Sequence, residues 1–324
     1  MSRQGSYLVA DVGGTNARFA IARGDRDDGF VLEQIRRFKN QDFADLHEAA
    51  QTYLEGCSGD RPSRGCVAVA GPVAREVIQL TNSTWRFRPD QMARDLGLSS
   101  LLPVNDFAAQ ARGALLVSPD ETYPLNRASP EPNAPCAVLG PGTGLGLGLL
   151  IPRAGAIEVV ATEGGHAGFA PRTEEERGVA RFLSGESSFV SWERLLSGAG
   201  LVNIHRALCY LERERWPEYR PEDITREALA DPASLSRRVV LLFCSVLGAY
   251  AGDVAVMSGA RGGVYLSGGI LPTIRSLIEA SDFRVRFEEH GPMTRYASAI
   301  PVWLLESDTA PLLGAAALAG SSGS

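Results

Sequence analysis

Apolar positions in the first part of the chain form short runs and then recur at helical spacing, which predicts strands and helices in turn. Two short runs, Tyr7–Val12 and Arg18–Arg23, flank Gly13-Gly14, so we expect a β-hairpin there. A third antiparallel strand is predicted at Val31–Phe38. The spacing of apolar residues over Phe43–Leu54 then predicts a helix.

The alternation continues along the next segments. The run Cys66–Ala70 is apolar throughout, which is typical of a buried strand. Further strands are predicted at Val77–Leu80 and Leu102–Asn105, and a helix at Phe107–Leu116. The stretch Pro119–Pro135 is rich in Pro, Asn and Ser, so we expect a loop and a domain boundary there.

A second block repeats the order of the first. Strands at Cys136–Leu139 and Leu147–Ile151 flank the glycine turn Gly140–Gly146, and Glu158–Thr162 predicts the next strand. Thr173–Glu176 fits a capping box, so a helix should begin there. The block ends with a long apolar helix, two strands and a small-residue helix, predicted at Ser236–Met257, Gly263–Ser267, Pro301–Leu305 and Pro311–Ala319. Such a duplicated plan is typical of proteins that clamp a nucleotide between two α/β domains.

Charge and cysteine content limit the class of protein. The chain of 324 residues has a net charge of −6 and a pI of about 5.4, so we expect no nucleic-acid partner. Its five cysteines are odd in number and show no C-x-x-C spacing, which favours reduced thiols in a cytoplasmic protein. The only lysine, Lys39, lies in a stretch, Arg36–Asn40, that we expect to be an exposed strand end, which argues against a Schiff-base or P-loop lysine.

Two segments bear on membrane insertion. Met1–Ala10 has no basic segment followed by a long apolar run, so we expect no signal peptide. Val239–Met257 is rich in apolar residues but contains Asp253, and its clean apolar run is shorter than the ~20 residues that a span needs. We therefore expect a buried core helix and no membrane partner.

The turn after the first strand carries the residue types of a phosphate site. Gly13 and Gly14 let the backbone come close to a ligand, and exposed N–H groups in such a turn can cradle phosphate oxygens. Asp11, at the strand end, can hold Mg²⁺ through water, and Thr15 and Asn16 add neutral donors. An ordinary hairpin turn is the alternative, but the residues around the glycines favour the phosphate interpretation.

Two later glycine segments suit the same nucleotide. Gly140–Gly146 has neither the G-x-G-x-x-G spacing of a dinucleotide site nor the lysine of a P-loop. As a turn with Gly142, Thr143 and Gly144, it suits a second phosphate contact. Gly268-Gly269 follows an apolar strand, where a turn lets an adenine ring lie close to the backbone; a tight strand–helix turn is an equal alternative.

A candidate base follows another strand. Asn105 and Asp106 stand at a strand's carboxyl end, where open α/β sheets place functional groups. Phosphoryl transfer to an alcohol needs a carboxylate that accepts the hydroxyl proton, a task that suits Asp106. A helix N-cap is the alternative role for Asp106, and both roles are compatible.

Glu163, His166 and Glu193 suit a polyhydroxyl ligand. Carboxylates and imidazoles exchange hydrogen bonds with neighbouring sugar hydroxyls. Glu163 and His166 flank two glycines directly after a predicted strand, which favours a binding site. The alternative is that these residues cap helices and stabilise the fold. Metal ligation is disfavoured, because no second histidine stands at ligand spacing.

Taken together, these segments resemble the bacterial glucokinase family, within the actin/hexokinase/Hsp70-like ATPase fold. The resemblance runs nearly from end to end and is carried by Asp11–Asn16, Thr81–Trp85, Asn105–Phe107, Gly142–Gly146, Glu163–His166, Glu193 with Leu196–Gly198, and Ser267–Ile270. The chain lacks the C-x-C-G-x-x-G-C zinc motif of the related kinase/repressor family, which places it in the non-zinc branch. Pro141, where a small residue is commoner, is the one departure noted.

The resemblance implies a two-domain, ribonuclease H-like α/β fold with a nucleotide and sugar cleft between domains. It implies a small domain of residues 1–116 plus 307–324, whose C-terminal helix returns to it, and a large domain of residues 117–306. Asp106 would be the general base, Asn105 would position the sugar, and Glu163, His166 and Glu193 would bind hydroxyls. A homodimer that uses ATP and Mg²⁺ to phosphorylate the 6-hydroxyl of glucose is implied as well.

Other functions stay open at this point. A kinase for another hexose, such as mannose or fructose, shares every motif above. A sugar-sensing regulator that does not phosphorylate is a different class, and it would have no need of a base such as Asp106. An Hsp70-like or actin-like ATPase is a third, against which the polar cluster Glu163–His166 argues.

Overall fold

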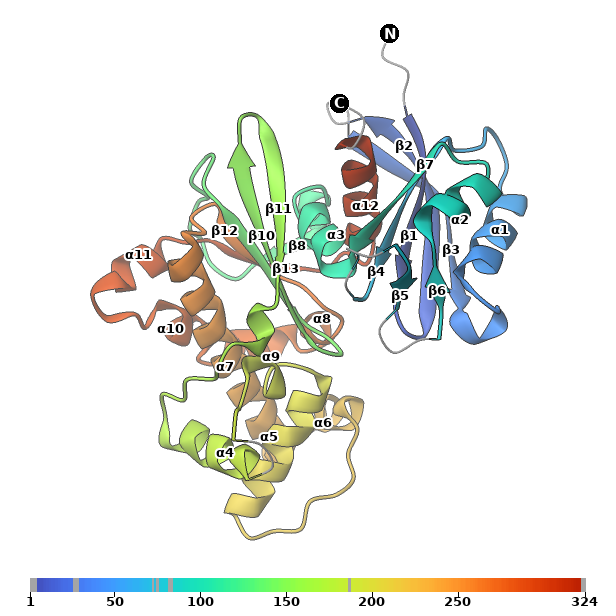
Figure 1. Cartoon of the computed structure of the whole chain (residues 1–324). Helices are drawn as coiled ribbons and strands as arrows, with labels where there is room; N and C mark the ends of the chain where they lie inside the picture. Colours follow the sequence, from blue (N-terminus) through green and yellow to red (C-terminus); the bar gives the residue numbers. More distant parts are fainter. Residues whose placement is uncertain are drawn as a thin grey trace. The chain divides into compact units, whose positions relative to one another are not determined.

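The structure is a computed structural model that describes residues 5–25, 29–71, 73, 76–80, 84–185 and 188–321. In it the chain divides into two compact units, each built on a mixed sheet flanked by helices (Figure 1). The first unit comprises Met1–Glu121 and Ser307–Ser324, and the second comprises Thr122–Glu306. Thr81, Asn82 and Ser83, which contribute to the resemblance, lie outside the described residues.

The described residues of the first unit form a five-stranded sheet in the order β3-β2-β1-β4-β7. Its strands are β1 (Gly5–Val12), β2 (Asn16–Asp25), β3 (Gly29–Lys39), β4 (Arg64–Val69) and β7 (Ser100–Asn105). The first three strands are antiparallel neighbours, which confirms the predicted hairpin around Gly13 and Gly14. β1, β4 and β7 run parallel. Short strands β5 (Ile78–Gln79) and β6 (Arg86–Phe87) pair with each other outside this sheet.

Helices cover both faces of this sheet because β1 is apolar on both. Leu8, Ala10 and Val12 pack in a cluster with residues of α1 (Leu46–Glu55) and α2 (Pro89–Asp95). Tyr7 and Val9 point to the other face, which α12 (Ala310–Ser321) covers together with α3 (Asp106–Gly113) (Figure 1). We call this second side the α12 face.

The helix predicted at Phe43–Leu54 begins later than expected. Asp45 is its N-cap, and the side chain of Asp45 accepts a hydrogen bond from the backbone N–H of Glu48 at 2.9 Å. Phe43 therefore lies outside the helix and packs against Phe38, with the ring centres 5.1 Å apart. The predicted start was wrong because an apolar residue with helical spacing need not be helical.

The described residues of the second unit form a six-stranded sheet in the order β11-β10-β9-β12-β13-β8. Its strands are β8 (Thr122–Pro124), β9 (Cys136–Pro141), β10 (Leu145–Arg153), β11 (Ala156–Thr162), β12 (Gly263–Leu266) and β13 (Val302–Leu305). β9, β10 and β11 are antiparallel neighbours, and β9, β12 and β13 run parallel. The pairing pattern of the first unit is thus repeated, as the duplicated sequence plan predicted.

β8 lies in the stretch that the sequence predicted to be a loop. It pairs antiparallel with β13, and Tyr123 stands opposite Leu304. The prediction was wrong here because β8 is three residues long and includes Pro124, which an edge strand tolerates. The same stretch also contains a 3-10 helix, η2 (Pro119–Glu121).

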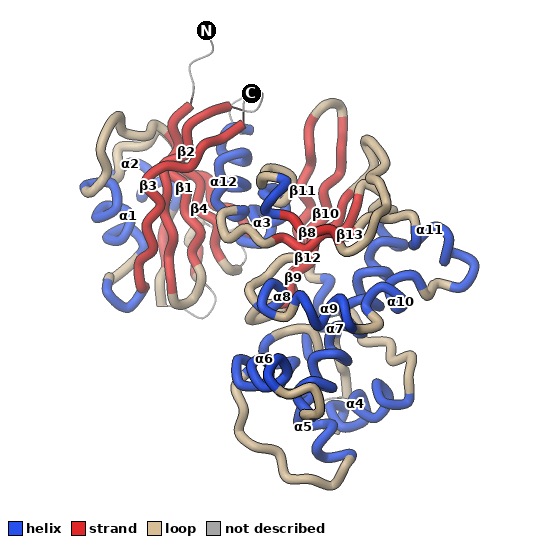
Figure 2. The backbone as a smooth tube through the Cα atoms, turned by 180° about the vertical axis from the view of Figure 1, so that it is seen from behind, coloured by secondary structure: helices blue, strands red, loops and turns tan. Residues whose placement is uncertain are grey.

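Helices of the second unit pack around α7 (Leu235–Ser258), as Figure 2 shows. α7 is long and apolar enough to span a membrane, but 78% of its most apolar window is buried, which confirms the predicted core helix. The capping box at Thr173 is also confirmed. The other helices are α4 (Glu174–Ser184), α5 (Gly198–Leu211), α6 (Pro221–Ala230), α8 (Ile270–Thr273), α9 (Arg275–Ala280), α10 (Phe283–Glu288) and α11 (Thr294–Ser298). Short 3-10 helices of this unit occur at η3 (Gly164–His166), η4 (Trp192–Arg194) and η5 (Gly291–Met293), and η1 (Asn40–Asp42) lies in the first unit.

Two glycines let α3 and α12 approach each other closely. A Cβ added at Gly113 would lie 1.8 Å from the carbonyl oxygen of Ala310, and one added at Gly314 would lie 1.8 Å from that of Ala109. Real Cβ atoms do not come so close to backbone, so any side chain here pushes the helices apart. This contact fixes the position of α3, whose first residue is Asp106.

We expect Gly314→Ala to destabilise the first unit by about 3 kcal/mol or more, because backbone meets backbone and neither side can yield by changing a rotamer. Gly320→Ala in the same helix is the matched control, because its Cβ first meets the ring of Phe30, at 3.3 Å. Urea unfolding followed by circular dichroism compares the two variants. Equal stabilities would contradict the packing described here.

Candidate functional site

The glycine turn of the first unit is stabilised by hydrogen bonds from one buried residue, Asn40. Gly13 N–H donates to the carbonyl oxygen of Asn16 at 3.0 Å. Asn40, which is buried, donates from its side-chain amide to Gly13 O at 2.8 Å and from its backbone N–H to Thr15 O at 2.9 Å. Gly14, Thr15 and Asn16 remain exposed. The turn is therefore fixed at its base and open to a ligand at its tip.

Asp11 lies on the α12 face beside this turn. Its Oδ2 accepts from Arg18 Nη2 at 2.6 Å, and Arg18 Nη1 also lies 3.5 Å from a carboxylate oxygen of Asp308. Among the described residues, no group of three or more His, Cys, Asp or Glu side chains has the arrangement of a metal site. Mg²⁺ commonly uses one or two carboxylates, phosphate oxygens and water. A single carboxylate such as Asp11 fits an ion that arrives with a nucleotide.

The candidate base lies at the same end of the sheet as the glycine turn. Val12 stands opposite Val69 on β4, and Val69 stands opposite Asn105 on β7. Two strand spacings separate Val12 from Asn105, which is about 10 Å. Asp106, the next residue, is partly exposed. The parallel register thus brings residues far apart in sequence to one sheet edge.

Asn105 is the N-cap of α3. The alternative role of N-cap that the sequence allowed for Asp106 is therefore wrong, because the cap lies one residue earlier. Asn105 Oδ1 accepts from the N–H groups of Phe107 and Ala108 at 3.0 and 3.1 Å. This use of the amide oxygen leaves the amide N–H groups as the part of the side chain that can donate to a ligand. Asp106 is the first helical residue, where the positive end of the helix dipole stabilises a negative charge.

The two glycine segments of the second unit lie next to each other. Ser267 N–H donates to Leu139 O at 2.8 Å, where β12 runs parallel to β9. Gly268 has a φ of +105°, and a Cβ there would lie 2.4 Å from the carbonyl oxygen of Pro141. Only glycine fits this position. The segment also joins β12 to α8, so the alternative of a strand–helix turn is correct as a description of the backbone.

Glu163, His166 and Glu193 come together, as the sequence predicted. His166 Nδ1 lies 3.8 Å from Glu193 Oε1, and His166 Nε2 lies 3.9 Å from Glu163 Oε2. A bridge between Gly168 and Ser191 holds their two segments side by side. The separations exceed hydrogen-bond length, so these polar atoms are available to a ligand.

The members of this cluster differ in their structural roles. Glu193 Oε2 accepts from the N–H of Leu145 at 2.8 Å and fills the space where a Cβ of Gly144 would lie. Glu193 therefore ties the cluster to the second glycine turn. Glu163 precedes η3 but its side chain makes no capping hydrogen bond, and it is 89% exposed. The alternative of helix capping has no support at Glu163.

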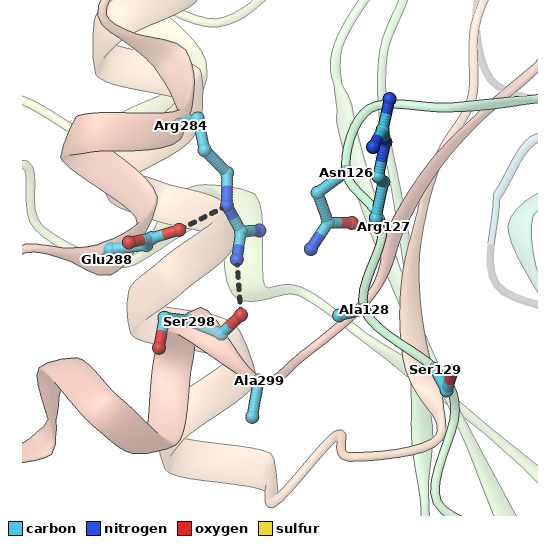
Figure 3. A pocket seen from close by; sticks show the side chains of 8 residues that line it. All are labelled: Asn126, Arg127, Ala128, Ser129, Arg284, Glu288, Ser298 and Ala299. Carbon is cyan, nitrogen blue, oxygen red and sulfur yellow. Dashed lines mark hydrogen bonds and ion pairs between the residues drawn. The ribbon is translucent and has the colours of Figure 1, made fainter.

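A separate pocket of the second unit contains none of the expected site residues. It lies between the segment 126–129 and the helices α10 and α11. Arg284 in this pocket donates to Glu288 at 2.5 Å and to the carbonyl oxygen of Ser298 at 2.9 Å. Figure 3 draws both bonds as dashed lines. Its guanidinium serves the local structure, so this pocket does not alter the site assignment.

Asn40 is the residue of the site that sequence reasoning missed. It follows the third strand immediately, and only the pairing of Asn16 with Lys39 brings it under the turn. No local pattern gives that pairing.

Comparison with known proteins places this geometry in a family. The family model described as Glucokinase matches residues 8–322. A glucokinase from Chromobacterium violaceum is 40% identical over 310 residues, which cover 96% of this chain and 88% of that protein. A glucokinase from Xanthomonas oryzae pv. oryzae is 43% identical over 319 residues, with coverages of 96% and 94%.

Solved structures agree with these matches. The glucokinase of an Antarctic psychrotroph is 34% identical, with a TM-score of 0.90 and coverage of 97% of this chain and 98% of that one. A glucokinase from Balamuthia mandrillaris in complex with glucose shares the fold at 20% identity, with a TM-score of 0.78 and coverages of 98% and 94%. The expected α/β, actin-like ATPase fold is confirmed.

Removal of the carboxylate should affect the stability of the protein at Glu193 but not at Glu163. We expect Glu193→Ala to lower stability by about 1–3 kcal/mol, because the Leu145 N–H loses its acceptor. Glu163→Ala should change stability by less than about 0.5 kcal/mol, as is usual for an exposed side chain. Thermal unfolding of the two variants measures the difference. A loss of the same size in both would show that Glu163 has a structural role.

Proposed function

This chain belongs to the glucokinase family of ATP-dependent hexose kinases, and we propose that its Asp106 is the general base in transfer of the ATP γ-phosphoryl group to the 6-hydroxyl of glucose. The products are ADP and glucose 6-phosphate. The observation that carries the proposal is the register of β1, β4 and β7, with Asn105 level with Val12 at the start of the Gly13–Asn16 turn.

In this proposal Asp106 accepts the proton of the 6-hydroxyl as the oxygen attacks the γ-phosphorus. The transition state of phosphoryl transfer is loose, so orientation of the nucleophile matters more than its strength. The side-chain amide of Asn105 orients the sugar by donating a hydrogen bond, since its oxygen already caps α3. Proton acceptance by a positioned carboxylate typically contributes about 10²–10⁴-fold to the rate.

ATP is assigned to the three glycine segments. Gly13, Gly14, Thr15 and Asn16 offer exposed turn groups to phosphate oxygens, and Gly142, Thr143 and Gly144 offer a second turn. Gly268 and Gly269 serve the adenine, since nothing lies within 4 Å of a Cβ built at Gly269. Asp11 would hold Mg²⁺ through water, and the ion when bound neutralises charge on the phosphate oxygens.

The cluster of Glu163, His166 and Glu193 is assigned to the other hydroxyls of glucose. A carboxylate that a bound sugar covers is left unsatisfied when that sugar lacks the partner hydroxyl, so such a cluster discriminates among hexoses. A kinase for mannose or fructose would use the same groups but would prefer a different hexose. A regulator that only binds sugar fits less well, because it has no use for Asp106.

Further features of the proposal rest on the family resemblance. They are a small domain of residues 1–116 plus 307–324, a large domain of residues 117–306, a homodimer, and action in the cytoplasm. The five cysteines are all free thiols, which is consistent with that compartment.

We expect Asp106→Asn to lower kcat by about 10²–10⁴-fold while glucose still binds, because the amide keeps the shape of the carboxylate but cannot accept the proton. Asp90→Asn is the matched control, since Asp90 stands in the first turn of α2. A coupled assay gives kcat, and calorimetry gives glucose affinity. Near-normal kcat in Asp106→Asn would end the assignment of the base.

We expect Glu163→Gln to raise KM for glucose by about tenfold or more and to leave KM for ATP unchanged, because one charged hydrogen bond to a hydroxyl is lost. Glu158→Gln on the neighbouring β11 is the control, since Glu158 is also an exposed glutamate. Kinetics with each substrate varied in turn measure both constants. Unchanged glucose kinetics would contradict the sugar assignment.

A further inference from the structure

The α12 face of the first unit ends in a row of polar side chains at the Gly13–Asn16 turn. In the strand register Asp11 stands opposite Arg18, Arg18 opposite Arg37, and Asn16 opposite Lys39. Directly opposed residues project from the same face, and so do residues two apart on one strand. All five side chains therefore share the α12 face.

The charges in this row are unevenly matched. Arg18 pairs with Asp11 at 2.6 Å and with Asp308 at 3.5 Å, and Arg37 lies 3.9 Å from Asp308. The side chain of Lys39 is exposed, and within the described part of the chain its ammonium group makes no hydrogen bond or ion pair. An unmatched positive charge thus stands beside a turn suited to phosphate.

The backbone holds Lys39 in this place. Asn40, the next residue, is 7% exposed and binds both Gly13 O and Thr15 O, at 2.8 and 2.9 Å. These bonds fasten the end of β3 to the turn. Lys39 therefore keeps its position next to Asn16, although its side chain is exposed.

We propose that Lys39 is a phosphate-binding residue for the nucleotide, with its ammonium group on the α12 face of the turn. The proposal rests on the assignment of this turn to ATP. An ammonium group is a compact point charge with three donors, which suits the several oxygens of a polyphosphate. Asp11, the residue assigned to Mg²⁺, lies on the same face. The two residues thus place opposite charges at the same edge of the turn.

The sequence makes this proposal easy to test, because Lys39 is its only lysine. An amine-specific acylating reagent therefore modifies a single side chain, and mass spectrometry of the peptide that contains it gives the rate. We expect a non-hydrolysable ATP analogue with Mg²⁺ to slow the acylation of Lys39 about tenfold or more, whereas adenosine and glucose leave it unchanged. Equal rates with and without the analogue would overturn the proposal.

Kinetics of variants provide a second test. Lys39→Met should raise KM for ATP by about tenfold or more, the usual scale for a lost charged hydrogen bond, and leave KM for glucose within about twofold. Lys39→Arg should recover most of the loss, because it restores the charge. Arg94→Met is the control, since Arg94 is an exposed cation on α2, on the other side of the sheet. Unchanged KM for ATP in Lys39→Met would contradict the proposal.

The two ways of failing are distinguishable. If the unaltered protein forms glucose 6-phosphate and Lys39→Met has a normal KM for ATP, only the role of Lys39 fails. If the unaltered protein transfers no phosphoryl group to glucose, the proposed function fails. The acylation experiment still decides whether nucleotide phosphates lie at Lys39, because it needs no turnover.

Discussion

The parallel pairing of β4 with both β1 and β7 is the constraint on which the candidate site depends. It sets Val12, Val69 and Asn105 level across the sheet, so the turn after β1 and the helix after β7 begin at one edge. A shift of one residue in either pairing would turn the side chains to the opposite face. In the second unit β9 and β12 also pair in parallel, and the ends of these strands bring Pro141 against Gly268.

Packing around this edge converts register into a fixed arrangement of functional groups. The close approach of α12 to α3 sets the position of the helix that begins with Asp106, and Asn105 caps that helix with its amide oxygen. Asn40 holds the glycine turn in place by donating hydrogen bonds to two of its carbonyl oxygens. In the second unit Glu193 joins the hydroxyl-binding cluster to the backbone of Leu145. Each of these contacts gives a site residue a defined place, and each typical hydrogen bond among them contributes about 1 kcal/mol to stability.

The sequence predicted what depends on local chemistry and missed what depends on register. The glycine turns were recognisable because Gly13-Gly14 and Gly142–Gly144 interrupt apolar strands, and Asp106 because a carboxylate follows another strand. The start of α1 was misplaced because Phe43 has helical spacing but precedes the N-cap, Asp45, and the alternative cap of α3 was misplaced by one residue. β8 and Asn40 escaped notice, because both owe their place to partners far along the chain. The proposed role of Lys39 in phosphate binding likewise depends on a pairing that the sequence does not give, that of Lys39 with Asn16.

The central claim is that the strand ends of both units hold the substrates. Hydrogen exchange on the millisecond-to-second scale, measured with and without a non-hydrolysable ATP analogue and glucose, tests this claim most directly. The account predicts that the analogue slows exchange at the amides of residues 13–16 and 142–145, and that glucose slows it at residues 163–166. Protection that appears only at other segments, or no protection at these three, would contradict the account.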